Sequence, residues 1–176
     1  MKERVLVIVG PTAAGKSKTA VRLAKRLDGE VISADSRQIY KGLDQSSGKI
    51  TEEEMKGVPH HLLSLADPKK QFSVAEYKKL AERKIKEIVA RGHMPIICGG
   101  TGFYIDAVTK GLVLPAVPPD KALRKKLALL DAGQLLKVLK KLDPERAKSI
   151  DPKNKVRLIR AGDNKAAAYV TCFLQN

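Results

Sequence analysis

Residues Gly10 to Ser17 place two glycines, a lysine and a serine at the spacing G-x-x-x-x-G-K-[ST]. Backbone N–H groups in such a loop surround a phosphate, and the dipole of a following helix favours negative charge there. Lys16 supplies a cation, and Ser17 offers a hydroxyl to Mg²⁺. The alternative is an ordinary tight turn between a strand and a helix. The motif predicts a phosphate site made of Gly10, Pro11, Thr12, Ala13, Ala14, Gly15, Lys16 and Ser17.

Two polar residues outside this motif are further candidates for a site. Asp35 directly follows a short apolar segment, and Thr101 lies in the glycine-rich turn Gly99–Gly102 after another. Carboxyl ends of parallel strands meet at one sheet edge, so we expect both residues near Lys16. Asp35 is also a modest candidate for the metal-holding carboxylate of nucleotide hydrolases and kinases. The alternatives are a solvated loop acid and simple turn chemistry.

The adjacent residues His60 and His61 could suggest metal binding or acid–base chemistry. No other histidine or cysteine lies near them in the sequence. Neighbouring side chains in a strand-like stretch point to opposite faces, so the two rings should point apart. We therefore favour structural or orienting roles for both.

Alternating strands and helices must position these candidates. The apolar run Val5–Val9 predicts a strand buried on both faces, as in a parallel sheet. A helix that stops at Asp28 and a short strand from Val31 should follow, and then irregular chain over 40–67 with short helical pieces. The capping box Ser73/Glu76 predicts a helix that stops at Gly92, and a strand over 94–98 comes next. This alternation predicts an α/β fold, a P-loop NTPase-like doubly wound parallel sheet.

The composition changes after residue 112. Three prolines in 113–119 suggest a linker, and residues 122–142 show helical spacing of leucines. Asp143-Pro144 and Asp151-Pro152 each place an N-cap acid before a proline, which predicts two more short helices. We predict an α/β core over 1–112, a basic helical appendage over 113–161 and an atypical tail over 162–176.

The charge balance favours a polyanionic partner. The 176 residues hold 34 Lys+Arg against 19 Asp+Glu, a net charge of +15. Between Asp120 and Arg160 there are 13 basic and 5 acidic residues, although a solvated charged surface is the alternative. No apolar stretch approaches the roughly 18 residues of a membrane helix. Cys98 and Cys172 lack zinc-site or disulfide-framework spacing, so we expect a protein of the cytoplasm without membrane contact.

Five blocks in order resemble one family. They are residues 10–20, the stretch Ser33–Asp44, the stretch Gly57–Leu62, the stretch Cys98–Tyr104 and the stretch Arg157–Ala161. Together they resemble the bacterial tRNA dimethylallyltransferases over about residues 4–161. The resemblance implies an enzyme that transfers a dimethylallyl group from dimethylallyl diphosphate to N6 of the adenosine 3′ to the tRNA anticodon, with Mg²⁺ and release of diphosphate. It also implies a monomer for the full-length form.

The resemblance implies a role for each matching residue. Lys16 and the loop amides bind diphosphate, and Ser17 is the metal ligand. Thr101 contacts the oxygen that links diphosphate to the allyl carbon, where charge develops. Asp35 is the general base for N6, which is a poor nucleophile because its lone pair is delocalised. The tRNA-contacting residues are Asp35, Ser36, Arg37, Gln38, Thr101, Val156, Arg157, Leu158, Ile159 and Arg160.

Residues 162–176 do not resemble the family, which continues with a long helical segment. We therefore expect a fragment or an altered carboxyl terminus. Three other functions stay open: a small P-loop kinase that uses ATP, a non-catalytic tRNA-binding fragment, and a prenyltransferase for free adenine nucleotides. The last is disfavoured by the basic appendage.

Overall fold

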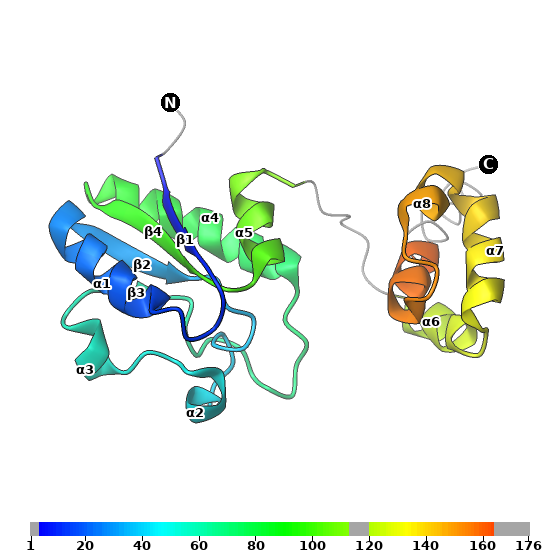
Figure 1. The fold of residues 1–176 in the computed structure, drawn as a ribbon, viewed down its shortest axis with the longest axis horizontal. Coiled ribbons are helices and arrows are strands. Elements are labelled where there is room, and N and C mark those ends of the chain that lie inside the picture. Colours follow the sequence, from blue (N-terminus) through cyan, green and yellow to red (C-terminus); the bar gives the residue numbers. More distant parts are fainter. Residues whose placement is uncertain (1–3, 113–119, 164–176) are drawn as a thin grey trace. The chain divides into compact units, whose positions relative to one another are not determined.

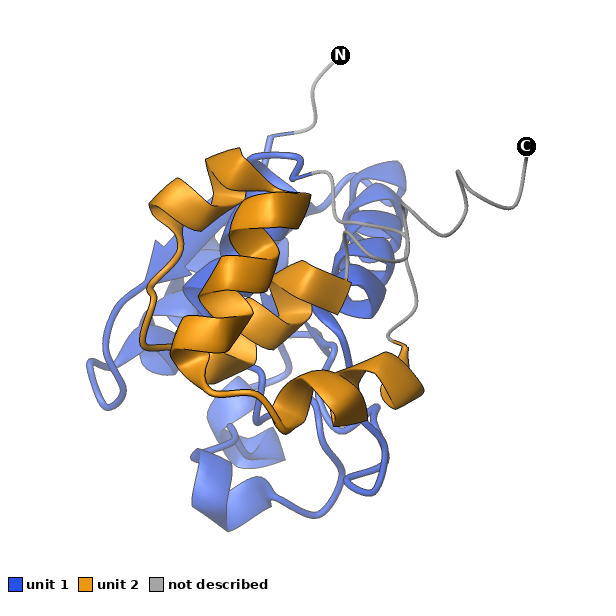
Figure 2. Ribbon diagram, turned by 90° about the vertical axis from the view of Figure 1, so that its right-hand side faces the viewer, with its two compact units in different colours: residues 1–114 blue, residues 115–176 orange. Residues whose placement is uncertain are grey.

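A computed structural model describes residues 4–112 and 120–163. The chain divides into two compact units, Met1–Leu114 and Pro115–Asn176 (Figure 2). The predicted linker over 113–119 and most of the predicted tail lie outside the described residues. The predicted three-part division therefore stays a prediction.

The first unit is built on a parallel sheet (Figure 1). Within the described residues its strands are β1 (Leu6–Val9), β2 (Gly29–Ser33), β3 (His60–His61) and β4 (Met94–Gly99), arranged in the order β1-β4-β2-β3. All three pairings are parallel, and the register places Val9 opposite Gly99. The predicted α/β fold with a parallel sheet is confirmed.

Helices cover both faces of this sheet, as the apolar strands require. Val31 and Ile96 pack with residues of α1 (Lys16–Leu27) on one face. Their neighbours Ile32 and Ile97 pack on the other face, against α4 (Val74–Ala90) and α5 (Gly102–Thr109). Helices α1 and α5 follow closely on β1 and β4, so their first turns lie beside the carboxyl edge of the sheet.

The capping box predicted at the start of α4 is present. Ser73 Oγ accepts a hydrogen bond from the backbone N–H of Glu76, and the Glu76 carboxylate accepts one from the Ser73 N–H at 2.7 Å. The helix ends at Ala90, and Gly92 adopts a φ of 84° in the following turn. Local capping chemistry was sufficient to place this helix.

The segment between β2 and α4 is mostly irregular, as predicted. It contains the short helices α2 (Asp44–Ser47) and α3 (Glu52–Met55) and the strand β3. The Lys49 ammonium group holds it together by donating to the Tyr40 carbonyl at 2.9 Å and to Ser64 Oγ at 2.6 Å. The loop is therefore fixed by its own polar contacts.

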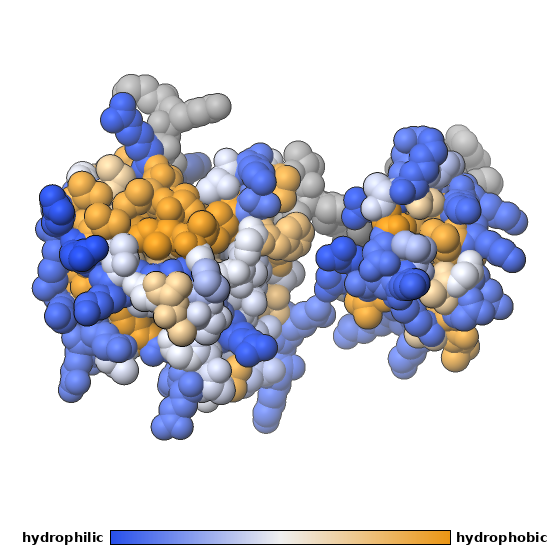
Figure 3. Space-filling model, in the orientation of Figure 1, coloured by the Kyte–Doolittle hydropathy of each residue, from blue (hydrophilic) through white to orange (hydrophobic). Residues whose placement is uncertain are grey.

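Strand β1 lies at the edge of the sheet, with β4 as its neighbour in the part of the chain that the structure describes. Its residues are only partly buried, and Val9 is 63% exposed. Figure 3 shows apolar side chains gathered on the face that carries this strand. A strand of this composition is usually covered on both sides, so in the described residues this edge is open to pairing with another strand.

The second unit is a small helical bundle. Its helices are α6 (Lys121–Ala128), α7 (Ala132–Leu142), α8 (Pro144–Ser149) and a helical segment over 155–163. The helical spacing of leucines over 122–142 corresponds to two helices, α6 and α7, which are separated by a short turn. There Asp131 forms a capping box with Gln134. The helix predicted after Asp143 is confirmed.

The helix start predicted at Asp151-Pro152 is wrong by about one turn. Asp151 instead accepts a hydrogen bond from the Lys153 N–H in a turn. Asn154 caps the helical segment, because its Oδ1 accepts from the Arg157 N–H at 3.1 Å. At the other end, Asp163 is 1% exposed and its Oδ2 accepts from Arg124 Nε at 2.6 Å. Asp163, assigned to the tail by sequence, therefore belongs to this core.

None of the helices in the two described ranges is both long and apolar enough to cross a membrane.

Candidate active site at the carboxyl ends of the strands

The Gly10–Ser17 loop joins β1 to α1 and adopts a conformation suited to an anion. Ala13 and Gly15 have φ values of 65° and 71°, so both adopt the left-handed region, and α1 begins at the next residue. Such turns point backbone N–H groups inward. Lys16 Nζ donates to the Pro11 carbonyl at 2.5 Å, which holds the ammonium group over the loop. The predicted phosphate loop thus has the expected strand, loop and helix context.

Asp35 lies in a tight turn just after β2. Its Oδ1 accepts hydrogen bonds from the backbone N–H groups of Arg37 at 2.9 Å and Gln38 at 3.4 Å. The residue is half-buried, and no hydrogen bond to Oδ2 is found among the described residues. One oxygen of the carboxylate is therefore committed to the turn, and the other is available to a substrate.

Thr101 is joined to the same loop. Its Oγ1 accepts a hydrogen bond from the Ser36 N–H at 2.9 Å and donates to Ser36 Oγ at 3.2 Å. Its own N–H donates to the Ala34 carbonyl at 3.0 Å. A Cβ at Gly99 would lie 2.2 Å from the Ala34 oxygen, so glycine is required for this close approach.

The phosphate loop borders this turn. A Cβ on Gly100 would lie 3.8 Å from the Gly10 carbonyl oxygen, and Val9 is opposite Gly99 in the sheet. The sheet edge therefore brings together three chain segments that are far apart in sequence: the anion loop, the carboxylate of Asp35 and the hydroxyl of Thr101.

The predicted RNA-contacting residues after Asp35 differ in their environments. The Arg37 side chain is exposed, whereas Gln38 is half-buried. Gln38 Oε1 accepts from Ser33 Oγ at 3.2 Å, and its amide nitrogen donates to the Gly48 carbonyl at 3.2 Å. Gln38 thus holds the loop after α2 in place.

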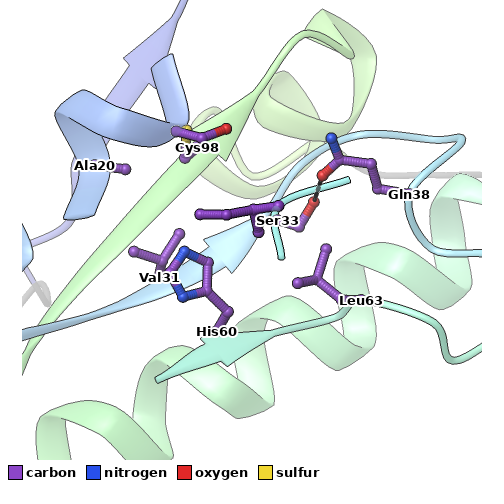
Figure 4. Close-up of a pocket in the computed structure, with 9 residues that line it drawn as sticks. Ala20, Val31, Ser33, Gln38, His60, Leu63 and Cys98 are labelled. Carbon is purple, nitrogen blue, oxygen red and sulfur yellow. Dashed lines mark hydrogen bonds between the residues drawn. The ribbon is translucent and has the colours of Figure 1, made fainter. Parts of the chain in front are cut away.

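A small cavity of about 20 Å³ lies beneath Ser17, between α1 and the sheet. Its lining is drawn in Figure 4 and includes Ser33, Gln38, His60 and Cys98. Burial raises the pKa of the Cys98 thiol to about 11, although the charge of Lys16 opposes this. The thiol therefore stays protonated at neutral pH and is not a nucleophile.

The two histidines point apart, as expected for adjacent strand residues. His60 lines this cavity and its Nδ1 contacts the Val58 carbonyl at 2.8 Å. Burial lowers the pKa of His60 below its ordinary value despite that hydrogen bond, so the ring favours the neutral form. His61 instead contacts the carboxylate of Glu30 at 2.6 Å.

Glu30 forms the centre of an ion-pair cluster that the sequence did not predict. Glu30 is 5% exposed, and its carboxylate accepts two short hydrogen bonds from Arg91 Nη2, at 2.9 and 2.8 Å. Burial alone would raise the pKa of Glu30, but the hydrogen bonds and charges of His61 and Arg91 hold it below the ordinary value. The cluster joins β2, β3 and the end of α4, and so supports the position of β3.

A tyrosine pair also escaped sequence reasoning. The rings of Tyr77 and Tyr104 stack with centroids 4.1 Å apart and 13° between their planes. Burial raises the pKa of Tyr104 to about 12, with smaller contributions from the charges of Tyr40, Glu76 and Asp35. Tyr104 therefore stays a neutral hydroxyl close enough to Asp35 to sense its charge. Only the tertiary fold brings these rings together.

The second unit carries the other predicted RNA-contacting residues. Val156, Arg157 and Arg160 are exposed, whereas Leu158 is 1% exposed and Ile159 packs against the same core. The apolar side chains of Leu158 and Ile159 therefore hold the helical segment in its bundle. The two arginines, one turn apart, form the accessible cationic face.

The described residues offer few ligands to a divalent cation. No group of three His, Cys, Asp or Glu side chains suited to a metal occurs within residues 4–112 and 120–163. Ser17, in the first turn of α1, offers one neutral oxygen. Mg²⁺ commonly takes few protein ligands and completes its shell with phosphate oxygens and water, so this donor set fits Mg²⁺ bound together with a diphosphate.

The parallel sheet and the phosphate loop between β1 and α1 define the class of P-loop NTPase-like α/β proteins. Within this class, the family model described as IPP transferase matches residues 38–164. This chain belongs to that family.

Curated relatives and solved structures support the same family assignment. A tRNA dimethylallyltransferase of Bacillus pumilus is 49% identical over 164 residues, which cover 91% of this chain and 52% of the relative. The crystal structure of a tRNA isopentenylpyrophosphate transferase from Bacillus halodurans is 48% identical with a TM-score of 0.64, covering 92% of this chain and 55% of that one. A eukaryotic dimethylallyltransferase acting on tRNA is 27% identical with a TM-score of 0.79, covering 97% and 44%. The chain spans about half the length of the curated relatives it matches.

Proposed function

We propose that this chain binds dimethylallyl diphosphate and provides the reacting site for transfer of the dimethylallyl group to N6 of the adenosine 3′ to the anticodon of tRNA. The observation that carries the proposal is the meeting of three groups at one sheet edge: the Gly10–Ser17 loop, Asp35 and Thr101. The names of the relatives give the dimethylallyl group and tRNA, and the resemblance of the sequence motifs implies the diphosphate donor and the N6 acceptor. The proposed setting is the cytoplasm.

The diphosphate would lie against the backbone N–H groups of the loop, with Lys16 released from the Pro11 carbonyl to pair with it. Mg²⁺, held by Ser17 and the diphosphate itself, would neutralise part of the negative charge of the leaving diphosphate. Thr101 can turn its hydroxyl proton from Ser36 Oγ to the oxygen that leaves, because a hydroxyl group rotates about its C–O bond to reach another acceptor. This places a donor where negative charge develops.

In the transfer step, the N6 lone pair attacks the allyl carbon and the bond from that carbon to the diphosphate oxygen breaks. The diphosphate leaves with the electron pair of this bond. The free oxygen of Asp35 takes the proton that N6 loses, which restores a neutral amine. Oδ1 stays bound to the Arg37 and Gln38 N–H groups throughout, so the carboxylate keeps its orientation.

The RNA would be held by exposed cations of both units. Arg37 lies beside Asp35, and Arg157 and Arg160 form one face of the second unit. Contacts to phosphates are expected to weaken steeply with salt. The target base must leave its stack to reach a site at a sheet edge, which is easier in an anticodon loop than in a duplex.

Thermal unfolding with ligands tests the donor assignment. We expect dimethylallyl diphosphate with Mg²⁺ to raise the unfolding temperature of the wild-type chain, and Lys16→Ala to abolish the shift. Lys79→Ala, an exposed lysine on α4, is the matched control and should keep it. Protection by ATP alone would instead support the P-loop kinase, and binding of tRNA without any effect of the diphosphate would support a non-catalytic RNA-binding fragment.

A further inference from the structure

A second, larger cavity of about 420 Å³ lies on the outer side of α1 and is separate in its lining from the Asp35 and Thr101 site. It runs between α1 and α3, and we call it the α1–α3 groove. Its walls carry Lys18, Arg22 and Lys25 from α1 and Lys56 from the end of α3. Ser17, the last residue of the phosphate loop, lies at one end.

The groove is cationic because four of its lining residues are lysine or arginine. Lys18, Arg22 and Lys25 follow one another at helical spacing and therefore share one face of α1. Within the described part of the chain, none of these three residues or Lys56 forms an ion pair with a carboxylate. The single acid in the lining, Glu54, already accepts a hydrogen bond from the Thr51 N–H at 3.0 Å in its capping box. Unpaired cations on concave walls attract anions strongly.

The floor of the groove is aliphatic. Val21 and Ile50 are the apolar residues of its lining, and because they are only 5% and 8% exposed we take them as the floor. No aromatic side chain lines the groove among the described residues, so it offers no surface on which a nucleobase could stack. Cationic walls over a small aliphatic floor fit a ligand with an anionic head and a short apolar tail.

The groove and the phosphate loop share a residue. Ser17 lines the α1–α3 groove, and it also lines the cavity beneath the loop. An anion at the Ser17 side of the groove would therefore lie close to the first turn of α1, which also carries Lys16. A ligand could pass from one position to the other along the first turn of this helix.

We propose that the α1–α3 groove is a capture site for the allylic diphosphate donor, which it holds and delivers to the phosphate loop. The proposal rests on the proposed function, because that function names the donor. The diphosphate pairs with the basic residues of the walls, and the branched five-carbon tail covers Val21 and Ile50. The high local concentration of donor beside Lys16 would then speed loading of the loop.

Nuclear magnetic resonance titration of the ¹⁵N-labelled chain tests this site directly. Lys16→Ala weakens the loop site, so that the groove can be observed by itself. In this variant we expect dimethylallyl diphosphate to shift the amide resonances of Arg22 and Ile50 in a saturable manner. Adding Arg22→Glu and Lys25→Glu should raise the Kd at least tenfold.

The matched control adds Lys79→Glu and Lys86→Glu, which are exposed lysines of α4 on the other face of the sheet. It makes the same change in net charge and should leave the Kd within twofold. Absent groove shifts in Lys16→Ala, or equal losses in both double variants, would overturn the capture site. Equal affinity for inorganic diphosphate would overturn the role of the allyl tail.

Failure of the proposed function gives a different result. In the wild-type chain, the Gly15 resonance reports on the phosphate loop. If it does not shift with the donor and Mg²⁺, the donor site of the proposed function is contradicted. If it shifts and the groove does not, only the capture site is overturned.

Discussion

The Thr101 hydroxyl accepts a 2.9 Å hydrogen bond from the backbone N–H of Ser36, across 65 residues of sequence. This bond ties the turn after β4 to the loop that carries Asp35. The proposed leaving-group donor and the proposed base therefore belong to one rigid arrangement, whose geometry is set before any substrate binds.

Thr101→Ala removes this hydroxyl, and we expect the rate of transfer to fall about 10²-fold in a single-turnover experiment, as for the loss of one donor to a developing oxyanion. Thr101→Ser keeps the hydroxyl and should retain most of the rate. Thr109→Ala is the control, because its hydroxyl bonds to the Ile105 carbonyl at the far end of α5. An unchanged rate in Thr101→Ala would remove this residue from the mechanism.

Asp35→Asn tests the base with little change in structure. Asn retains an oxygen for the Arg37 and Gln38 N–H groups but cannot take a proton from N6. We expect turnover to fall roughly 10²- to 10⁴-fold, with RNA affinity nearly unchanged, because proton transfer matters only in the transition state. Binding and transfer rates measured on the same variant decide this. Equal losses in both would refute the assignment.

The Glu30 cluster predicts a pH-dependent contribution to stability. The pKa of Glu30 is lowered in the folded chain by His61 and Arg91, the groups that face it from β3 and α4. Its stabilisation is therefore complete above the unfolded pKa of about 4.3 and is lost as the pH falls through the folded value. Glu30→Gln weakens hydrogen bonds to a charged group and should lower the free energy of unfolding by about 2 kcal/mol at pH 7, and the difference should shrink below pH 4.

Urea unfolding from pH 7 to pH 3 measures this difference. Glu82→Gln makes the same chemical change in a more exposed i,i+4 pair with Lys78 and should cost less than about 0.5 kcal/mol. A Glu30→Gln difference that does not vary with pH would show that the cluster stabilises by packing alone.

The exposed edge of β1 predicts self-association. Within residues 4–112 and 120–163 no strand pairs with the outer edge of β1, and such an apolar edge is a site for pairing with another chain. We expect larger species to appear in sedimentation velocity as the concentration rises, and Val9→Lys to reduce them. Leu129→Lys replaces an 86% exposed leucine of the second unit and is the control. Equal behaviour of both variants would place the association elsewhere.

Sequence reasoning succeeded where the determining interactions are local. The loop Gly10–Ser17 carries its own conformational requirements, and the capping box of Ser73 and Glu76 lies within one turn. Both are therefore visible as short motifs. The residues Asp35 and Thr101 were placed at one edge through the topology rule for parallel strands, and the structure brings their loops together.

Long-range contacts could not be predicted in the same way. The pairing of Glu30 with Arg91 joins residues 61 positions apart, and that of Arg124 with Asp163 joins residues 39 apart. Nothing in the spacing of these residues indicates a partner. The helix start at Asn154 was missed for a different reason. Asp151-Pro152 and Asn154 both offer a local cap pattern, and the start at Asn154 is the one that accompanies the packing of Leu158 in the core.

The central claim is tested most directly by following the allyl group. The chain would be incubated with Mg²⁺, unmodified tRNA and dimethylallyl diphosphate that carries a label in its allyl group, and the label retained in the tRNA would be counted. We predict label in the tRNA, lost in Lys16→Ala and in Asp35→Asn. No label, even when the residues that extend the longer relatives are supplied as a second chain, would contradict the proposed function.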